Sequence, residues 1–280
     1  MKKNKMPEKA YKNLDFLNSA AARTVRILSE FYEPQWRFRK NSIIDTIVFF
    51  GSARLLSSND ALKQLRKLTK EKNGNDKTYS AELKRAERLY EMSRYYDDAV
   101  ELSKRLTEWS MNLPLEEKRF IVCTGGGPGI MEAANKGAKL AGGPTVGLNI
   151  SIPFEQSVNK YVDKELAFEF HYFFMRKFWL IYLAKALIVF PGGFGTFDEL
   201  MEVLTLTQTG KITKKMKVIV YDENYWKEVI NFEKLIEYGT INKSDMKLFD
   251  FCSTVDDAFR LITEHFKKHY LNHKEVKGKK

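Results

Sequence analysis

Two glycine-rich turns constrain this 280-residue chain more than any other feature of its sequence. The turn GGGPG at 125–129 and the turn PGGFG at 191–195 each follow a short apolar run and precede a segment with helical spacing. Glycine permits a tight turn and a close approach to the backbone, and the N–H groups that open a helix attract anions. Both turns are therefore expected at strand-to-helix junctions, where a phosphate group can bind.

Apolar runs alternate with helical segments along most of the chain. Strands alternating with helices predict a parallel sheet covered by helices on both faces, a Rossmann-like, doubly wound α/β fold. Strands are expected at 43–50, 119–124, 144–150, 166–171, 187–190 and 217–221.

The sheet domain is expected to cover residues 41–264. Residues 1–40 are expected to form an N-terminal helical extension with a basic start, and residues 265–280 a basic tail. The charged stretch 55–93 is expected to be an inserted helical hairpin, with an exposed loop as the alternative.

Helix boundaries can be placed at several points. Apolar residues at helical spacing predict a helix over 13–33 that Pro34 ends, because proline disrupts a helix interior. The sequence KNGND at 72–76 is expected to separate the two halves of the inserted hairpin. Thr254, followed three residues later by Asp257, predicts a capped final helix.

The charge distribution limits the partners. The net charge is +11, but nine of these charges lie in residues 1–12 and 265–280. The nearly neutral body is a poor footprint for nucleic acid and is compatible with a small anionic ligand. The longest apolar stretch, at 178–190, contains Lys185 and is shorter than the roughly 18 residues of a membrane span. Without an apolar signal segment at the start, the expected compartment is the cytoplasm.

Cysteine and histidine give no sign of a metal site. Cys123 and Cys252 each lie in an apolar run and are expected to be buried, reduced thiols. Of four histidines, three lie in the lysine-rich C-terminal segment. No metal ligand set is therefore predicted.

A basic residue and an acidic residue are expected to meet at the second turn. Arg176 begins a predicted helix that leads into the strand at 187–190, so it lies at the carboxyl edge of a parallel sheet. Glu199 is expected in the first turn of the next helix, and Thr196 can add a hydroxyl donor to the glycine backbone. Arg176, this turn and Glu199 can therefore converge around one ligand.

Two neighbouring charges have more than one interpretation. Asp198 is expected to stabilise the start of its helix, where a carboxylate favours the helix dipole. Lys177 is a candidate substrate-binding residue because it neighbours Arg176, with a solvated or loop-pairing charge as the other interpretation.

These residues resemble a known family. The segment GGGPGIMEAANKGA, the Arg176–Lys177 pair and PGGFGTFDE resemble the Lonely Guy (LOG) family, whose pattern is PGGxGTxxE and whose members were often mislabelled lysine decarboxylases. FFGSAR at 49–54 is similar to the family's opening strand. The resemblance covers residues 43–54 and 94–225.

The resemblance implies hydrolysis of the N-glycosidic bond of a nucleoside 5′-monophosphate, releasing a free base and ribose 5-phosphate. It implies no metal or organic cofactor, and at least a homodimer. Arg176 and Glu199 match the family's catalytic pair. The matching phosphate-loop residues are Gly192, Gly193, Gly195 and Thr196, and weaker ligand candidates are Gly126, Gly127 and Ser52.

The expected substrate is a purine nucleotide, AMP first. Plant members carry Met-His-Glu before the Arg-Lys pair, where this chain has Phe173, Phe174 and Met175. The alternative is a carrier of a nucleotide or phosphorylated cofactor without catalysis, similar to molybdenum-cofactor carriers, which needs the glycine turns alone. A decarboxylase would require a pyridoxal-phosphate lysine, and neither Lys177 nor Lys185 has a supporting set of residues.

Overall fold

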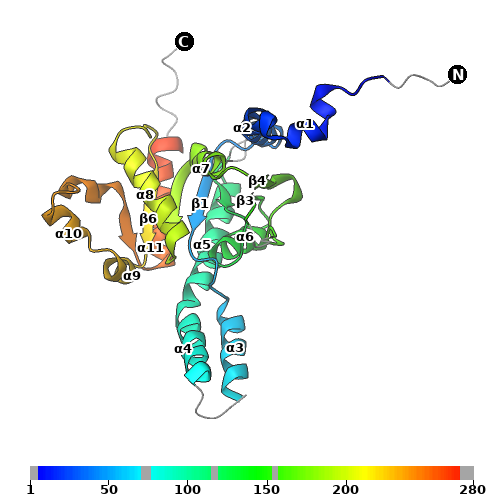
Figure 1. Ribbon diagram of the computed structural model, residues 1–280. Helices are drawn as coiled ribbons and strands as arrows, with labels where there is room; N and C mark the ends of the chain where they lie inside the picture. Colours follow the sequence, from blue (N-terminus) through cyan, green and yellow to red (C-terminus); the bar gives the residue numbers. More distant parts are fainter. Residues whose placement is uncertain (1–5, 71–76, 115–118, 153–156, 272–280) are drawn as a thin grey trace.

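A seven-stranded sheet lies at the centre of the computed structural model, which describes residues 6–70, 77–114, 119–152 and 157–271 (Figure 1). All neighbouring strands in the sheet pair in parallel. Helices cover both faces, so the predicted doubly wound α/β fold is confirmed. The strands are β1 (Thr46–Phe50), β2 (Ile121–Thr124), β3 (Thr145–Ile150), β4 (Ala167–Phe170), β5 (Ala184–Val189), β6 (Lys217–Tyr221) and β7 (Asp250–Cys252).

The strand order creates one switch point, between β1 and β5. The order is β4-β3-β2-β1-β5-β6-β7, so the chain builds outward from β1 on one side and then starts again from β5 on the other. Connections leave the two strands toward opposite faces at such a point, which opens a crevice outside their carboxyl ends. The second glycine turn follows β5 at this crevice.

Strand β1 shows why the sheet needs two helical layers. All five of its residues are buried. Ile47 and Phe49 belong to one apolar cluster, whereas Val48 and Phe50 belong to the other, as the alternation of side chains along a strand requires. The first cluster is covered by α5 (Arg94–Met111), α6 (Ile130–Leu140) and α11 (Val255–Phe266), and the second by α2 (Arg23–Lys40), α7 (Phe173–Tyr182) and α8 (Phe194–Gln208).

The N-terminal helix does not end at Pro34 as predicted. Helix α2 continues through this buried proline to Lys40, whereas the earlier part of the expected helix is broken into α1 (Leu14–Asn18) and a short turn. Proline lacks the N–H that would bond to the carbonyl of Glu30. That carbonyl accepts a hydrogen bond from the Trp179 indole at 3.0 Å instead, so a tertiary contact replaces the missing helical bond.

The charged insertion is a helical hairpin. Helices α3 (Ser58–Lys70) and α4 (Lys77–Met92) lie side by side and project away from the sheet (Figure 1). The expected break at 72–76 lies outside the described residues. The described part of this segment is therefore a helical hairpin, as predicted, and not an exposed loop.

The described end of the chain is helical. Thr254 caps α11 as expected, accepting the Asp257 N–H at 3.1 Å. A further helical turn follows at Lys267–Leu271, and the remainder of the predicted tail, 272–280, lies outside the described residues. The division into extension, sheet domain and tail stays a prediction.

Strand β5 begins at Ala184, three residues before the predicted start at 187. The charge of Lys185 argued against a buried strand at this position, but its ammonium group pairs with the buried Asp45 carboxylate at 3.3 Å. Helix α7 correspondingly begins at Phe173, before Arg176. The short edge strand β7 and helices α9 (Glu223–Val229) and α10 (Phe232–Glu237) were not predicted.

The two cysteines and the lengths of the helices can also be compared with the predictions. Cys123 and Cys252 are free and buried, as predicted, and burial raises the pKa of each thiol to about 12. Across the described ranges, no helix combines the length and apolar character needed to cross a membrane.

Candidate active site

Arg176 is held in place by the carboxyl edge of the sheet. It is the fourth residue of α7, and its Nε donates to the Leu148 carbonyl of β3 at 2.8 Å. Its guanidinium lies against Gly125, where an added methyl group would overlap Nη2. Glycine is therefore required at 125 for the arginine to reach this position.

Glu199 faces Arg176 from the neighbouring helix. Helix α8 begins at Phe194, so Glu199 lies in its second turn and not in the first as expected. Its Oε1 is 3.6 Å from Arg176 Nη1, an ion pair that is too long for a hydrogen bond. The other oxygen, Oε2, is buried with no hydrogen-bond partner among the described residues.

Burial controls the charge of this pair. The pKa of Glu199 is raised to about 7, chiefly by burial. Arg176 and Lys177 act to lower this pKa, and the nearby carboxylates of Glu202 and Asp198 act to raise it. Burial also lowers the pKa of Arg176. In both groups the loss of water on burial outweighs the attraction between the two charges. A carboxylate with a pKa near the working pH is suited to general base catalysis.

A backbone hydrogen bond joins the segments that follow β1 and β5. The Ser52 N–H, just after β1, donates to the Pro191 carbonyl, just after β5, at 3.0 Å. An added Cβ on Gly192 would lie 3.0 Å from the same Ser52 nitrogen and would overlap the Thr196 hydroxyl. Ser52, Gly192 and Thr196 therefore meet at the switch point.

The remaining glycines of the second turn leave open space. Gly193 is the cap residue of α8 and Gly195 lies in its first turn. Both are exposed, and a methyl group added to either would meet no atom of the described residues within 4 Å. Packing does not require glycine at these positions, so the bare N-terminus of α8 is accessible to a ligand.

The first glycine turn is a packing junction instead. The Ile130 N–H that opens α6 donates to the Ser52 carbonyl at 3.1 Å, and an added methyl group at Gly129 would overlap that carbonyl. The Gly126 N–H donates to the Thr124 hydroxyl at 2.9 Å. The protein therefore uses two of the N–H groups that were expected to bind an anion at this turn.

Asn159 completes the junction and was missed by the sequence analysis. Its Nδ2 group donates to the carbonyls of Gly126 and Gly127, each at 3.0 Å, and to Asn135 Oδ1 at 2.9 Å. Asn135 is itself fully buried and accepts from the Thr124 hydroxyl. Side chains from other segments therefore hold the carbonyls of Gly126 and Gly127, and a role for these two glycines in ligand binding stays a prediction.

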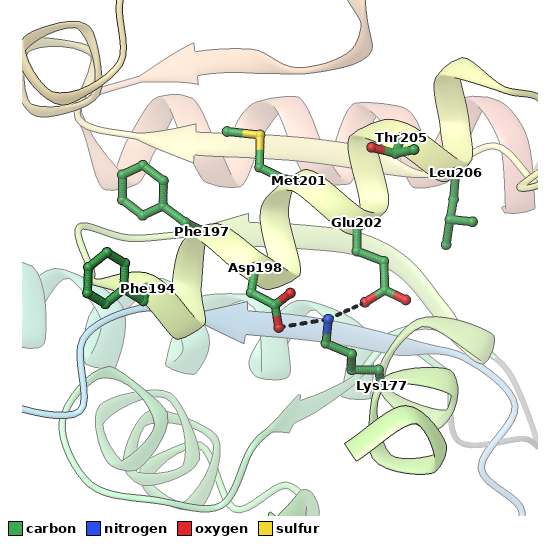
Figure 2. Close-up of a pocket in the computed structure, with 8 residues that line it drawn as sticks. All are labelled: Lys177, Phe194, Phe197, Asp198, Met201, Glu202, Thr205 and Leu206. Carbon is green, nitrogen blue, oxygen red and sulfur yellow. Dashed lines mark ion pairs between the residues drawn. The ribbon is translucent and has the colours of Figure 1, made fainter. Parts of the chain in front are cut away.

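Lys177 and Asp198 pair with each other on the outer face of α8. Lys177 Nζ lies 2.7 Å from Asp198 Oδ2 and 2.8 Å from Glu202 Oε2 (Figure 2). Asp198 is the fifth residue of α8, beyond the first turn, so this ion pair replaces the expected helix-start role. The three residues line a groove of about 480 Å³ whose lining does not include Arg176 or Glu199.

Tyr225 supports the second turn from outside and was also missed. Its hydroxyl donates to the Gly192 carbonyl at 3.0 Å. The Tyr225 N–H is capped by Asp222, whose left-handed backbone (φ 71°) follows β6 directly. The N-cap aspartate at 222 is the one sequence signal that could have placed this tyrosine at the start of a helix.

Sequence comparisons link the chain to the phosphoribohydrolases. A family model described as "Possible lysine decarboxylase" matches residues 131–262, which contain Arg176 and Glu199. The cytokinin riboside 5′-monophosphate phosphoribohydrolase LOG2 of Arabidopsis thaliana is 25% identical over 62% of this chain and 78% of its own length. A rice protein (Oryza sativa subsp. japonica) named "Probable cytokinin riboside 5'-monophosphate phosphoribohydrolase LOGL2" is 26% identical over 62% of this chain and 68% of its own length. These matches confirm the resemblance to the Lonely Guy family.

A solved structure is also similar to this chain. The molybdenum cofactor binding protein of Rippkaea orientalis is 17% identical, over 79% of this chain and 96% of its own, with a TM-score of 0.47.

Replacing Glu199 by glutamine should stabilise the protein at alkaline pH. The folded pKa of about 7 lies above the usual glutamate value, so the native state binds more protons than the unfolded chain between these values. Wild-type stability should therefore fall as pH rises from about 4.5 to 7, by roughly 1 to 3 kcal/mol. Glu199→Gln should escape this loss, equalling wild type at pH 5 and exceeding it at pH 8 in urea unfolding.

The matched control is Glu101→Gln, which removes an exposed carboxylate from α5 and should not alter the pH dependence. A Glu199→Gln protein that is less stable than wild type at pH 8 would contradict the burial argument.

Proposed function

We propose that this chain, whose sequence resembles the Lonely Guy phosphoribohydrolases, hydrolyses the N-glycosidic bond of a nucleoside 5′-monophosphate. The products would be a free base and ribose 5-phosphate. The observation that carries the proposal is the buried Glu199 carboxyl, 3.6 Å from the Arg176 guanidinium, beside the accessible N-terminus of α8.

The 5′-phosphate is proposed to bind at the start of α8. The bare backbone at Gly193 and Gly195 and the positive end of a 15-residue helix support this assignment. Thr196 and Gly192 are proposed to complete the loop. Ser52 is a weaker candidate, because its hydroxyl already accepts the Arg54 N–H at 3.1 Å.

Glu199 is proposed to activate water and to stabilise the ribosyl cation. Cleavage of a ribosyl–base bond passes through an oxocarbenium-like sugar, as in glycoside hydrolysis. The water oxygen bonds to C1′ while the C1′–N bond breaks, and the base nitrogen takes up a proton from solvent in place of the lost bond. Glu199 later returns to solvent the proton that it takes from the attacking water. The Glu199 carboxylate can accept the proton from water and oppose the positive charge that develops on the sugar.

Arg176 is proposed to assist from the opposite side. Its Nε is engaged with Leu148, which fixes the guanidinium plane and leaves the Nη groups to act. Those groups can donate to the leaving base or clamp an anionic oxygen. Because one end of the side chain is already bound, little ordering is left for the substrate to impose.

The base is proposed to be a purine, with AMP as the first substrate to test. Phe173 and Phe174, which stand where plant members carry Met-His, are both more than half exposed at the start of α7. Flat aromatic side chains at this position suit a planar base.

The protein is proposed to be at least a homodimer. The same helix exposes Phe178 and Tyr182 in addition to its first two phenylalanines. Four large exposed aromatic side chains on one ten-residue helix are typical of a surface that another chain covers. Light scattering at micromolar concentration should give at least twice the mass of 32.6 kDa, and a monomer would contradict the proposal.

A nucleotide panel tests the activity directly. The protein is incubated at pH 8, where Glu199 is mostly ionised, with common nucleoside 5′-monophosphates and with adenosine, and the free base is resolved by chromatography. Adenine should be released from AMP, and adenosine should react at least about 100-fold more slowly because it lacks the orienting phosphate. Glu199→Gln should lower turnover by at least about 100-fold while leaving AMP binding within a few-fold.

Glu101→Gln again serves as the control with unchanged turnover. Failure of every monophosphate to release base would refute the hydrolase, and tight AMP binding without turnover, unaffected by Glu199→Gln, would support the carrier.

Removing the Tyr225 hydroxyl should loosen the proposed phosphate loop. Tyr225→Phe deletes the hydrogen bond to the Gly192 carbonyl but keeps the ring. The KM for AMP should rise about fivefold, the equivalent of one neutral hydrogen bond, with kcat within about twofold. Tyr238→Phe, an exposed surface tyrosine, should leave both constants unchanged. A Tyr225→Phe enzyme with wild-type KM would show that the loop does not depend on this contact.

A further inference from the structure

Glu30 forms hydrogen bonds with helix α7 and the residues before it at two points. Its carboxylate accepts the backbone N–H groups of His171, at 2.8 Å, and Tyr172, at 3.2 Å, immediately before the helix begins. Its own carbonyl accepts the Trp179 indole N–H at 3.0 Å, two turns further along α7. One residue of α2 therefore binds both the start and the middle of the helix that carries Arg176.

Pro34 makes the second contact available. In an uninterrupted helix the carbonyl of residue 30 would bond to the N–H of residue 34, but proline has none. The freed carbonyl is the acceptor that the Trp179 indole uses. Phe31 packs against the rings of Phe178 and Trp179, with centroids 5.5 and 5.9 Å apart, so the polar contacts are made next to an apolar one.

Helix α7 needs an external acid at its N-terminus. Its first turn contains no acidic residue, and its cap residue, Tyr172, makes no side-chain cap hydrogen bond among the described residues. Arg176 and Lys177 place positive charge near the positive end of the helix dipole, which is unfavourable. The Glu30 carboxylate, from a different helix, accepts the N–H of the cap residue Tyr172 and places a negative charge at this end of α7.

Tyr172 connects Glu30 to Arg176 through two backbone hydrogen bonds. Tyr172 gives its N–H to Glu30 and accepts the Arg176 N–H on its carbonyl at 3.2 Å. A movement of the helix start is therefore transmitted directly to the arginine. At the far end of the side chain, Gly125 and Leu148 leave Arg176 little freedom to compensate.

We propose that Glu30 is a positioning residue that fixes the start of α7 and thereby holds Arg176 opposite Glu199. This gives the N-terminal extension a role in the active site, although α2 lies outside the matched span 131–262. The catalytic part of the proposal rests on the proposed function, whereas the positioning of Arg176 does not.

The experiment compares Glu30→Ala and Glu30→Gln in the full-length protein. Alanine removes both acceptor oxygens, whereas glutamine retains one. Glu33→Gln is the matched control, because Glu33 lies on the same helix but pairs with Arg37. The first readout is the pH titration of the Glu199 carboxyl by ¹³C NMR, identified by its absence in Glu199→Gln.

Displacement of Arg176 removes a charge that lowers the pKa of Glu199. Glu30→Ala should therefore raise that pKa above the wild-type value, Glu30→Gln should raise it less, and Glu33→Gln should not change it. In an Arg176→Ala background, Glu30→Ala should cause no further change.

The second readout is turnover of AMP. Misplacement of the arginine should lower kcat about 10- to 100-fold in Glu30→Ala and less in Glu30→Gln. If the wild type releases no base, the proposed function fails and the titration alone still decides the positioning role. If Glu30→Ala does not fold, Glu30→Gln provides the comparison.

A folded Glu30 variant in which the Glu199 titration is unchanged would overturn the proposal. So would a shift of equal size in the absence of Arg176, because the effect would then not pass through the arginine.

Discussion

The buried carboxyl of Glu199 is the group on which the rest of the site depends. The fold removes it from water, gives it a cation at 3.6 Å and provides no hydrogen bond for its second oxygen among the described residues. Such a group costs stability when it ionises, and its pKa of about 7 expresses that cost. Strongly shifted pKa values are concentrated at functional sites, and this is why we propose Glu199 as a catalytic residue.

Several elements of the fold position the groups around that carboxyl. The sheet supplies the switch point between β1 and β5, and α8 rises from it with an accessible N-terminus. Helix α7 supplies Arg176, which β3 and the bare backbone of Gly125 hold in one orientation. The two glycine turns, similar in sequence, therefore differ in their surroundings. Two N–H groups of the first turn bond within the protein, whereas Gly193 and Gly195 of the second turn face open space.

Much of this arrangement could be predicted from the sequence. Alternating apolar and helical segments gave the parallel sheet, and parallel topology alone brings Arg176 and the turn at 191–195 to the same edge. The errors have local causes. Lys185 concealed the start of β5 because its charge is neutralised by Asp45, and Pro34 did not end α2 because Trp179 satisfies the freed carbonyl.

The supporting residues could not be predicted. Asn159, Tyr225 and Glu30 each act on a segment more than 30 residues away, through hydrogen bonds that only the folded chain brings together. A glycine-rich pattern also does not show whether its N–H groups are free. At the first turn the Ile130 N–H bonds to the carbonyl of Ser52, a residue that only the folded chain brings close. Sequence patterns indicate which elements form, whereas occupancy of a site depends on tertiary contacts.

The central claim is that one ligand joins the start of α8 to the Arg176–Glu199 pair. A crystal structure of Glu199→Gln soaked with AMP tests this most directly. The phosphate should lie against the backbone of Gly193 and Gly195, with C1′ of the ribose between the side chains at 176 and 199. A phosphate bound elsewhere, such as at the first glycine turn or in the groove beside Lys177, would contradict it.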